Sequence, residues 1–385
     1  MLKSFKKSFT AAAVAVALSA VVISAPAQAD KGKHYAVDNV EGSLSVMVLG
    51  SGGPQIQDSG RASAGYLIFA DGQPYAIMDA GSGTFKSLGM SGAHIGQVNT
   101  ILLSHMHIDH VSEVPGIVKG IYFDGQLQGM QHTAPINVYG PEGRAAGALY
   151  PASLPGVMPP HGASPRFPST SEFMDALFAK DTGNFNYLRT FVGAVDGGPP
   201  IIGHFGYTAH DLSSNYHTYN PEVIVDDVKS DGSELKITDV AVNHFEAPAV
   251  AYRIDYKDHS VVYTGDIHSD IRDDHIAEDL ANENIVKLAA GADYLIYDTS
   301  ITDTAPPAFS PFAKRHTTPK SIGRIAAAAG VKTLVLSHLT PVSDPNIDAI
   351  KTEIAAQGFT GHIRVAKDLK VYNLGDSKDE DHDDD

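Results

Sequence analysis

The segment 104–110, with the sequence SHMHIDH, constrains this chain most, because it places four metal-ligating side chains within six residues. It follows the apolar run 98–103, which has the pattern of a buried strand. Neutral imidazoles and carboxylates are good ligands for zinc and similar divalent ions. The alternative is a polar loop of solvated histidines, but H-x-H-x-D-H spacing directly after a strand favours a metal site. Because one short loop cannot complete a coordination sphere, we expect further ligands from distant parts of the chain.

Strand-like runs alternate with helix-like stretches along the sequence. In the first half we expect strands at 45–49, 65–69, 75–78, 100–103 and 136–139, and a short helix at 111–120. In the second half we expect strands at 235–243, 250–256, 260–263, 294–297 and 333–336, and helices at about 273–290 and at 319–329. Two β-rich halves that each carry helices predict an α/β fold in which two sheets pack together and helices cover them outside.

Between the two halves, over about 144–234, the pattern gives way to a stretch rich in Pro, Gly and aromatic residues. An unstructured stretch of that length is implausible inside a core. We therefore expect 144–234 to be a folded insertion that caps one face of a domain running from 30 to 375. Its aromatic side chains are expected to form a small core of the insertion rather than a binding surface.

Both ends of the chain have the character of segments outside that domain. Residues 1–29 combine three lysines, an apolar run at 10–23 and the tripeptide Ala27-Gln28-Ala29 before Asp30, which is typical of a cleaved signal peptide. The apolar run is shorter than the roughly 20 residues that cross a bilayer. We therefore expect a periplasmic or secreted protein that keeps no membrane anchor. Residues 376–385 are expected to be an acidic, disordered tail.

Composition limits the chemistry of such an exported protein. There is no cysteine, so any metal must be held by His, Asp or Glu. The formal net charge of -17 becomes -20 without the leader, because three of the 28 basic residues lie in it and none of the 45 acidic ones does. Phosphate backbones reward clustered Lys and Arg, so nucleic acid is not expected as a partner. A homodimer is compatible with the sequence.

Three further ligand candidates, His244, Asp266 and His338, each follow a predicted strand. With the first cluster they make seven ligands, which suits two adjacent ions that share one bridging carboxylate. For any one of these residues taken alone, a loop or cap residue with satisfied hydrogen bonds is the alternative. The recurrence of all three after apolar strands favours a metal centre.

With these motifs, the chain resembles the metallo-β-lactamase-fold hydrolases. Among these hydrolases it is most similar to the ribonuclease Z (tRNase Z) branch. The resemblance runs from about Ser43 to Asn373, apart from the insertion. The motifs that carry the resemblance, besides the histidine cluster, are LGSGGP at 49–54 with Arg61, MDAG at 78–81, PG at 115–116, VYGP at 138–141, AYRI at 251–254 after His244, GD at 265–266 and HTT at 316–318. The resemblance implies a four-layered αβ/βα sandwich.

The resemblance also implies two sets of metal ligands joined by one carboxylate. One zinc would be held by His105, His107 and His244, a second by Asp109, His110 and His338, and Asp266 would bridge the two. Mn²⁺ or Fe²⁺ fit the same ligand types. Two close ions lower the pKa of a shared water to near neutrality, giving hydroxide at physiological pH. Asp109 would also orient that nucleophile, and Asp79 would order the histidine loop as a hydrogen-bond acceptor.

A proton donor is implied as well. The ribonuclease Z branch uses a histidine in an H-x-T motif, steered by an acidic residue, and His316 and Asp298 occupy those positions. His316 would protonate a departing alkoxide as a general acid. The alternative for His316 is a structural residue beside a helix N-cap, and the alternative for Asp298 is a structural carboxylate at a strand end. The branch usually has Glu where Asp298 stands, so the role of Asp298 depends on whether this shorter side chain reaches His316.

One departure from the branch bears on function. Bacterial tRNase Z carries a long basic arm between the strand after the third histidine and the bridging aspartate. Here only residues 255–260 separate Ile254 from Val261, which predicts a tight turn. Without the arm, and with an acidic, exported chain, we do not expect pre-tRNA processing. The leading hypothesis is an exported dinuclear zinc hydrolase that cleaves a small phosphodiester or a related anionic ester such as a phosphonate or sulfate.

Three alternatives stay open. Hydrolysis of a β-lactam or a lactone ring fits the fold and the export signal, and needs no equivalent of His316. A non-catalytic metal-binding protein would usually have lost at least one ligand. An oxygen-using di-iron protein commonly has a carboxylate where His107 stands.

Overall fold

A computed structural model describes residues 34–127, 132, 134–145, 166–179, 183, 187, 206–304 and 310–375. Met1–His34 and Tyr35–Asp385 are separate compact units, and the fold below is that of the second. The expected leader at 1–29 and the expected tail at 376–385 lie outside the described residues. Among the residues that are described, no helix has the length and apolar character that a membrane span requires.

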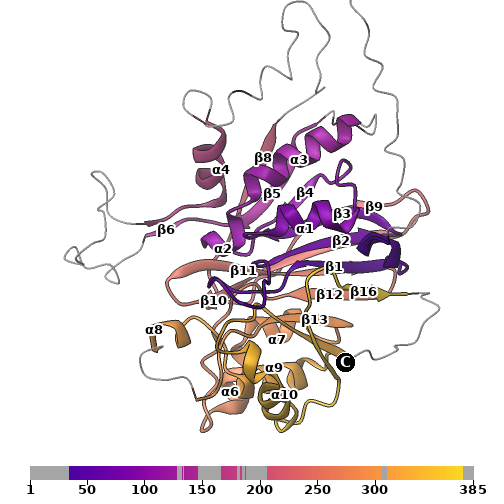
Figure 1. The fold of residues 1–385 in the computed structure, drawn as a ribbon. Coiled ribbons are helices and arrows are strands. Elements are labelled where there is room, and N and C mark those ends of the chain that lie inside the picture. The colour runs from indigo at the N-terminus through magenta and orange to yellow at the C-terminus, as the bar shows by residue number, and fades with distance from the viewer. Residues whose placement is uncertain are drawn as a thin grey trace, which may run out of the picture. The chain divides into compact units, whose positions relative to one another are not determined.

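Two seven-stranded sheets form the centre of the fold (Figure 1). The first sheet contains, in spatial order, β16 (Val371–Leu374), β1 (Leu44–Gly50), β2 (Gly65–Ala70), β3 (Gln73–Ala80), β4 (Thr100–Leu102), β5 (Ile136–Pro141) and β8 (Tyr207–Leu212). The second contains β15 (His362–Val365), β14 (Thr333–Ser337), β13 (Tyr294–Asp298), β12 (His259–Tyr263), β11 (Ala247–Tyr256), β10 (Glu234–His244) and β9 (Glu222–Val228). A small ribbon joins β6 (Arg144–Ala145) to β7 (Arg166–Phe167).

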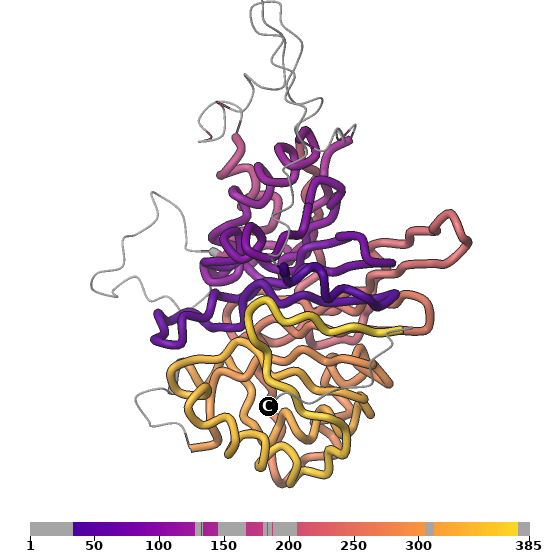
Figure 2. Tube along the Cα trace, turned by 45° about the vertical axis from the view of Figure 1, so that its right-hand side comes forward, coloured from indigo at the N-terminus to yellow at the C-terminus, as the bar shows by residue number. Residues whose placement is uncertain are grey.

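Helices cover the outer faces of both sheets, and Figure 2 shows the two helical layers on opposite sides. The chain carries, in order, α1 (Thr84–Ser91), α2 (Ile108–Val111), α3 (Val114–Leu127) and α4 (Thr170–Phe178) with the first sheet, and α6 (Ile276–Asn282), α7 (Asn284–Leu288), α8 (Ser310–Ala313), α9 (Pro319–Ala329) and α10 (Ile347–Ala355) with the second half. Short 3₁₀ turns lie at Ala36–Asn39 and Asp344–Asn346. The predicted four-layered αβ/βα sandwich is confirmed.

Three hydrophobic cores explain this layering. Successive side chains of a strand point to opposite faces, so a strand between two layers must be apolar throughout. In β1, Val46 and Val48 belong to the core between the sheets, whereas Met47 and Leu49 belong to the core under α1 and α3. A third core packs α7, α9 and α10 on the second sheet. The apolar runs found in the sequence are therefore strands buried on both faces.

The helix predicted at 319–329 illustrates how local signals set element ends. The Thr318 side chain accepts a hydrogen bond from the backbone N–H of Ser321, Pro319 occupies the first turn, and Gly330 ends the helix with φ 64°. The observed α9 spans Pro319–Ala329, in agreement with the prediction. The helix expected at about 273–290 is instead divided, because Glu283 is extended between α6 and α7.

The predicted insertion at 144–234 is too wide. β8 pairs with β5 at the edge of the first sheet, and β9 pairs with β10 at the edge of the second. Residues 206–228 thus contribute to the sandwich rather than to a cap, because both strands bond directly to core strands. The segments 146–165, 180–182, 184–186 and 188–205 of the predicted cap lie outside the described residues.

The turn between β11 and β12 is tight, as the sequence predicts. Only Lys257 and Asp258 connect the two strands, with φ of 47° and 64°. Positive φ at both central residues is the geometry of a two-residue hairpin turn. Lys257 Nζ contacts both carboxylate oxygens of Asp71 at 2.8 and 2.9 Å, which ties this hairpin to the β2–β3 turn of the other sheet.

Asp239, a buried carboxylate in β10, makes stability depend on pH. Burial, and secondarily Glu222 on the neighbouring strand, raise the pKa of Asp239 to about 7. Since the folded state then holds a proton that the unfolded state releases, stability falls as pH rises from about 4 to about 7. We expect Asp239→Asn to raise the free energy of unfolding at pH 8 by up to about 4 kcal/mol and to change it little at pH 4. Urea titrations at both pH values measure this, with the exposed Asp258→Asn as the control; an equal gain at both would contradict the assignment.

Candidate metal centre

The seven predicted metal ligands lie together at one edge of the sandwich, where several strands end. His244 is the last residue of β10, Asp266 follows β12, and His338 follows β14. The loop between β4 and α2 supplies His105 and His107, and α2 itself supplies Asp109 and His110. The side chains form two groups that share Asp266: His105, His107, His244 and Asp266, and Asp109, His110, Asp266 and His338. Within each group the ligand atoms lie within 4.8 Å of one another.

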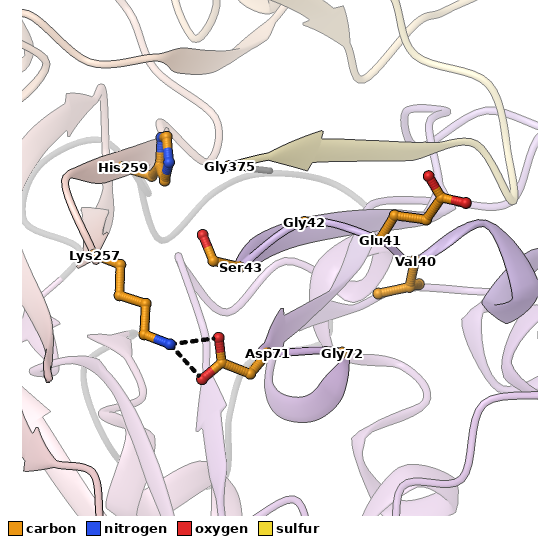
Figure 3. Close-up of a pocket in the computed structure, with 9 residues that line it drawn as sticks. All are labelled: Val40, Glu41, Gly42, Ser43, Asp71, Gly72, Lys257, His259 and Gly375. Carbon is orange, nitrogen blue, oxygen red and sulfur yellow. Dashed lines mark hydrogen bonds and ion pairs between the residues drawn. The ribbon is translucent and has the colours of Figure 1, made fainter. Parts of the chain in front are cut away.

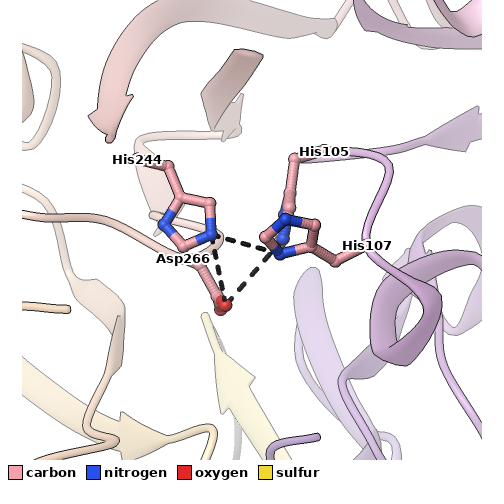
Figure 4. A group of neighbouring side chains, drawn as sticks. All are labelled: His105, His107, His244 and Asp266. Carbon is pink, nitrogen blue, oxygen red and sulfur yellow. Dashed lines mark hydrogen bonds and ion pairs between the residues drawn. The ribbon is translucent and has the colours of Figure 1, made fainter. Parts of the chain in front are cut away.

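In the first group, three imidazoles and one carboxylate point toward a common centre (Figure 4). His244 Nε2 lies 3.3 Å from His107 Nδ1 and 3.8 Å from Asp266 Oδ2. His105 Nε2 lies 3.9 Å from the same carboxylate oxygen. His105 and His244 are fully or almost fully buried, at 0% and 1% exposure.

In the second group, the spacing is closer. His110 Nε2 and His338 Nε2 each lie 3.2 Å from Asp266 Oδ1, and they lie 3.1 Å from each other. Asp109 Oδ2 lies 3.1 Å from His338 Nε2 and 3.5 Å from His110 Nε2. The two oxygens of Asp266 therefore face different groups, as a bridging carboxylate requires.

These spacings fit divalent metal ions. Two ligands about 2.0–2.1 Å from one tetrahedral ion lie about 3.3 Å apart, which is close to most of the distances observed. His105 Nε2 and Asp266 Oδ1 are also buried with no hydrogen-bond partner among the described residues. Buried polar atoms normally have a hydrogen-bond partner, so these two atoms are suited to bind a metal ion at the centre. The donor set of nitrogen and carboxylate oxygen is one that zinc accepts.

Hydrogen bonds from the outer ring nitrogens orient three of the imidazoles. His110 Nδ1 contacts Asp79 Oδ2 at 2.7 Å, His244 Nδ1 contacts the carbonyl oxygen of Arg315 at 2.8 Å, and His338 Nδ1 contacts Ser300 Oγ at 2.6 Å. When His110 and His244 donate from Nδ1 to these oxygens, the lone pair of Nε2 faces the centre. Such outer contacts fix both ring orientation and tautomer in metal sites.

The charges of the centre call for a cation. Asp79, Asp266 and Asp298 are each at most 3% exposed. Burial raises the pKa of Asp266, but His338 and His110 lower it further, so the net pKa is well below its usual value. Burial lowers the pKa of His338, but Asp266 and then Asp109 raise it to about 10. A divalent cation bound between the groups would balance the negative charge of these buried carboxylates.

Left-handed backbone conformations occur around the centre, at Phe245 with φ 57° and at three further positions. Asp79 has φ 53°, His338 has φ 56°, and Gly265 has φ 58°. A Cβ at Gly265 would lie 2.4 Å from Ser104 Cβ, so only glycine lets the end of β12 approach the histidine loop. Such conformations in non-glycine residues are uncommon and often mark functional sites.

Asp79 accepts four hydrogen bonds while fully buried. The donors are the Ser104 backbone N–H at 2.7 Å, the Ser104 hydroxyl at 2.7 Å, His110 Nδ1 at 2.7 Å and the Tyr263 hydroxyl at 2.6 Å. The carboxylate thus connects the start of the histidine loop to β12. This is the ordering contact that the sequence predicts for Asp79.

We expect Asp79→Asn to destabilise the protein by about 3 kcal/mol or more, because an amide cannot accept from all of these donors and leaves some of them buried and unsatisfied. Zinc affinity should fall by about 10–100-fold, as His110 loses its orientation. Thermal unfolding and chelator competition measure the two effects. Tyr263→Phe, which removes a single donor, is the control; unchanged zinc affinity in Asp79→Asn would contradict the role.

His316 and Asp298 form a pair beside the two groups. His316 Nδ1 lies 2.6 Å from Asp298 Oδ2, so the shorter aspartate does reach the histidine. His316 is only 3% exposed, and its ring centroid lies 5.7 Å from those of His244 and His338. Burial raises the pKa of Asp298, but His316 lowers it further, so the net pKa lies below its usual value. The Asp298 carboxylate thus holds the His316 ring beside the two ligand groups.

The sequence did not predict two groups that contact the site residues. Ser300 contacts both His338 and Asp298, and its place two residues after β13 in the DTS run was a signal that could have been read. The Arg315 carbonyl that orients His244 is a backbone atom, and no residue pattern reveals such a partner.

A separate hollow lies at the opposite ends of the strands, next to the turns β2–β3 and β11–β12 (Figure 3). It has a volume of about 590 Å³ and is lined by Val40, Glu41, Gly42, Ser43, Asp71, Gly72, Lys257, His259 and Gly375. Lys257 is bound to Asp71 there, as the dashed lines show. This hollow contains none of the metal-ligand candidates.

Comparison with known proteins finds similarity to one superfamily and to ribonuclease Z proteins. The metallo-beta-lactamase superfamily matches at residues 59–125. The ribonuclease Z of Mycobacterium marinum is 23% identical over 331 residues, covering 85% of this chain and 97% of the relative. The ribonuclease Z of Mycobacterium avium is 27% identical over 337 residues, covering 85% and 96%.

Two solved structures show the same similarity in three dimensions. Human tRNase Z, short form, has a TM-score of 0.55 and 19% identity, and the similarity covers 86% of this chain and 98% of that one. The metallo-beta-lactamase fold protein YhfI from Bacillus subtilis has a TM-score of 0.51 and 18% identity, with the same coverage of 86% and 98%. The similarity therefore extends far beyond the histidine loop.

Proposed function

We propose, on the premise that this chain is a ribonuclease Z-like metal-dependent hydrolase of the metallo-β-lactamase fold, that it holds two zinc ions and cleaves a small phosphodiester or a related anionic ester. The observation that carries this proposal is the His316–Asp298 contact of 2.6 Å beside the two ligand groups. A diester with a poor leaving group needs a proton donor at that oxygen. Opening a lactam or lactone ring needs no such donor, because the leaving atom stays attached.

Each residue has a distinct part in this proposal. Zinc bound by the two groups would lower the pKa of a water to near neutrality and offset the charge at the attacked centre. Asp109, with its side chain 12% exposed at the mouth of the second group, orients the attacking water through its carboxylate. His316 gives a proton to the departing oxygen, and Asp298 holds its ring through Nδ1 so that Nε2 carries the proton to be transferred.

Two features of the chain, the short β11–β12 connection and the negative charge, support a small substrate. The β11–β12 connection is a two-residue turn, so this hairpin offers no arm that could hold a large RNA. The net charge of -17 also opposes a polyanion. A compact ester with one or two negative charges can instead be neutralised by the metal ions alone.

A substrate panel tests the proposal on the zinc-loaded full chain. Bis-p-nitrophenyl phosphate, an aryl sulfate, a chromogenic cephalosporin, an acyl-homoserine lactone and a pre-tRNA with a 3′ trailer should be compared under identical conditions. We expect turnover of the diester to exceed that of the cephalosporin and the lactone. An Asp266→Ala preparation purified in parallel excludes contaminating esterases. Preference for the ring substrates or for pre-tRNA would overturn the proposed substrate class.

Export completes the proposed function, because residues 1–29 have the features of a cleaved leader. We expect the protein expressed from the full sequence to be recovered from the periplasm or the medium with Asp30 or a close neighbour as its N-terminus. Intact mass spectrometry measures this. Recovery of the chain with Met1 in the cytoplasm or the membrane fraction would contradict export.

A further inference from the structure

The two-residue turn between β10 and β11 lies directly beside the first ligand group. It consists of Phe245 and Glu246, the residues that follow His244. Phe245 adopts φ 57°, and Glu246 is 6% exposed although it carries a carboxylate. A buried carboxylate at a turn needs a partner, and its partner here is Arg315.

Arg315 binds Glu246 with two donors of its guanidinium. Its Nε donates to Glu246 Oε1 at 2.8 Å, and its Nη2 donates to the same oxygen. The guanidinium also lies over the Phe245 ring, 5.4 Å from the ring centroid. Arg315 is thus held by both residues of the turn.

The backbone of Arg315 connects this ion pair to the chemistry of the centre. Its carbonyl oxygen accepts the hydrogen bond from His244 Nδ1 at 2.8 Å, which turns His244 Nε2 toward the metal ligands. The next residue along the chain is His316, which Asp298 holds from the other side. One peptide unit therefore influences a predicted metal ligand and the proposed general acid together.

The turn itself is held from the first half of the chain. Arg144 Nη2, from β6, donates to the carbonyl oxygen of Phe245 at 2.9 Å and to that of Glu246. Two arginines thus hold the two-residue turn: Arg144 binds the backbone of the turn, and Arg315 binds the Glu246 side chain.

Stability alone does not account for the Glu246–Arg315 pair. The Glu246 side chain is 7% exposed and that of Arg315 is 27% exposed, so the carboxylate loses most of its hydration when the pair forms, which offsets much of the stabilisation that the pair provides. In addition, Glu246 Oε2 is buried with no hydrogen-bond partner among the described residues, so the carboxylate is only partly satisfied.

We infer that Glu246 and Arg315 are positioning residues: their ion pair places the Arg315 carbonyl so that His244 faces the first metal ion, and keeps His316 beside the centre. The catalytic part of this inference rests on the proposed function, whereas the effect on His244 does not. The effect on His244 can therefore be measured by metal binding, without a substrate.

Cobalt(II) substitution provides that report, because the visible absorption of cobalt follows its ligand geometry. We expect Glu246→Ala to change the cobalt spectrum, to weaken binding of one of the two ions by about 10–100-fold, and to lower kcat more than it raises KM. Glu246→Gln keeps an oxygen acceptor for Arg315 and should restore the spectrum and most of the affinity, with a loss below about tenfold because the neutral hydrogen bond is weaker.

Asp293→Asn is the matched control. The Asp293 side chain is 8% exposed, against 7% for Glu246, and it also pairs with a basic side chain, that of Lys332, but it lies immediately before β13, away from the centre. A cobalt spectrum and affinity in Glu246→Ala equal to wild type, with a loss of stability like that of Asp293→Asn, would overturn the inference. If the wild-type enzyme cleaves no diester, the proposed function fails, but the spectrum and affinity still decide the role of the pair.

Discussion

Asp266→Ala should leave the protein with one metal ion or none and lower turnover by at least about 10³-fold. Asp266 Oδ1 lies 3.2 Å from both His110 Nε2 and His338 Nε2, and Oδ2 faces the first group. Alanine removes the one carboxylate that both groups share, so neither keeps its full ligand set. Under the proposed function, the variant would then lack the ions that would lower the pKa of a bound water to near neutrality.

Elemental analysis after zinc loading measures the metal content, for which we expect two ions per chain in the wild type. Asp109→Ala is the comparison variant, because Asp109 belongs to the second group alone and should lower the count by no more than one. Circular dichroism verifies that both variants are folded. Two ions retained in Asp266→Ala, or one ion or none in the wild type, would refute a dinuclear centre bridged by this residue.

The ligand residues could be predicted because each follows an apolar run whose end is visible in the sequence. Strand ends at one edge of a sheet converge in space, so His244, Asp266 and His338 meet although 94 residues separate the first from the last. The structure brings them together with the histidine loop as expected. Asp79 is a similar case, because its place at the end of β3 puts it below that loop.

The edge strands could not be predicted, for a physical reason. β9 reads EVIVDDV, and most of its side chains are exposed or half-buried, so hydrophobic periodicity is weak. β8 reads YTAHDL and carries a similar mixture. Their strand conformation depends on hydrogen bonds to β10 and β5, which are tertiary contacts.

The break between α6 and α7 has the same kind of cause. The buried side chain of Asn284 donates to the carbonyl oxygens of Tyr216, Thr218 and Ala241. These three acceptors come from the loop before β9 and from β10, far from Asn284 in sequence. A continuous helix over 273–290 would have to give up this contact or shift it, so the tertiary partner decides where the second helix begins.

His316→Ala should lower turnover of alkyl diesters by about 10²–10⁴-fold, the range for loss of a general acid, while leaving metal content unchanged. His316 is not among the seven predicted ligands, and its Nδ1 is occupied by Asp298 at 2.6 Å. An alkoxide leaves poorly without a proton, whereas p-nitrophenolate is stable as an anion. The loss should therefore be large for a methyl or ethyl leaving group and small for p-nitrophenol. Rates for a series of leaving groups with increasing pKa, in wild type and variant, measure the difference as a change in slope.

Asp298→Asn provides the graded comparison, because an amide oxygen can still accept from His316 Nδ1 but no longer stabilises a charged ring. It should show a smaller change of slope than His316→Ala, in the same direction. A lactone or β-lactam should show no dependence on His316, since its leaving atom stays tethered. An equal loss for all leaving groups, or zinc lost from His316→Ala, would make His316 a structural residue. The phosphodiester proposal depends on the opposite result, because it assigns protonation of the departing oxygen to His316.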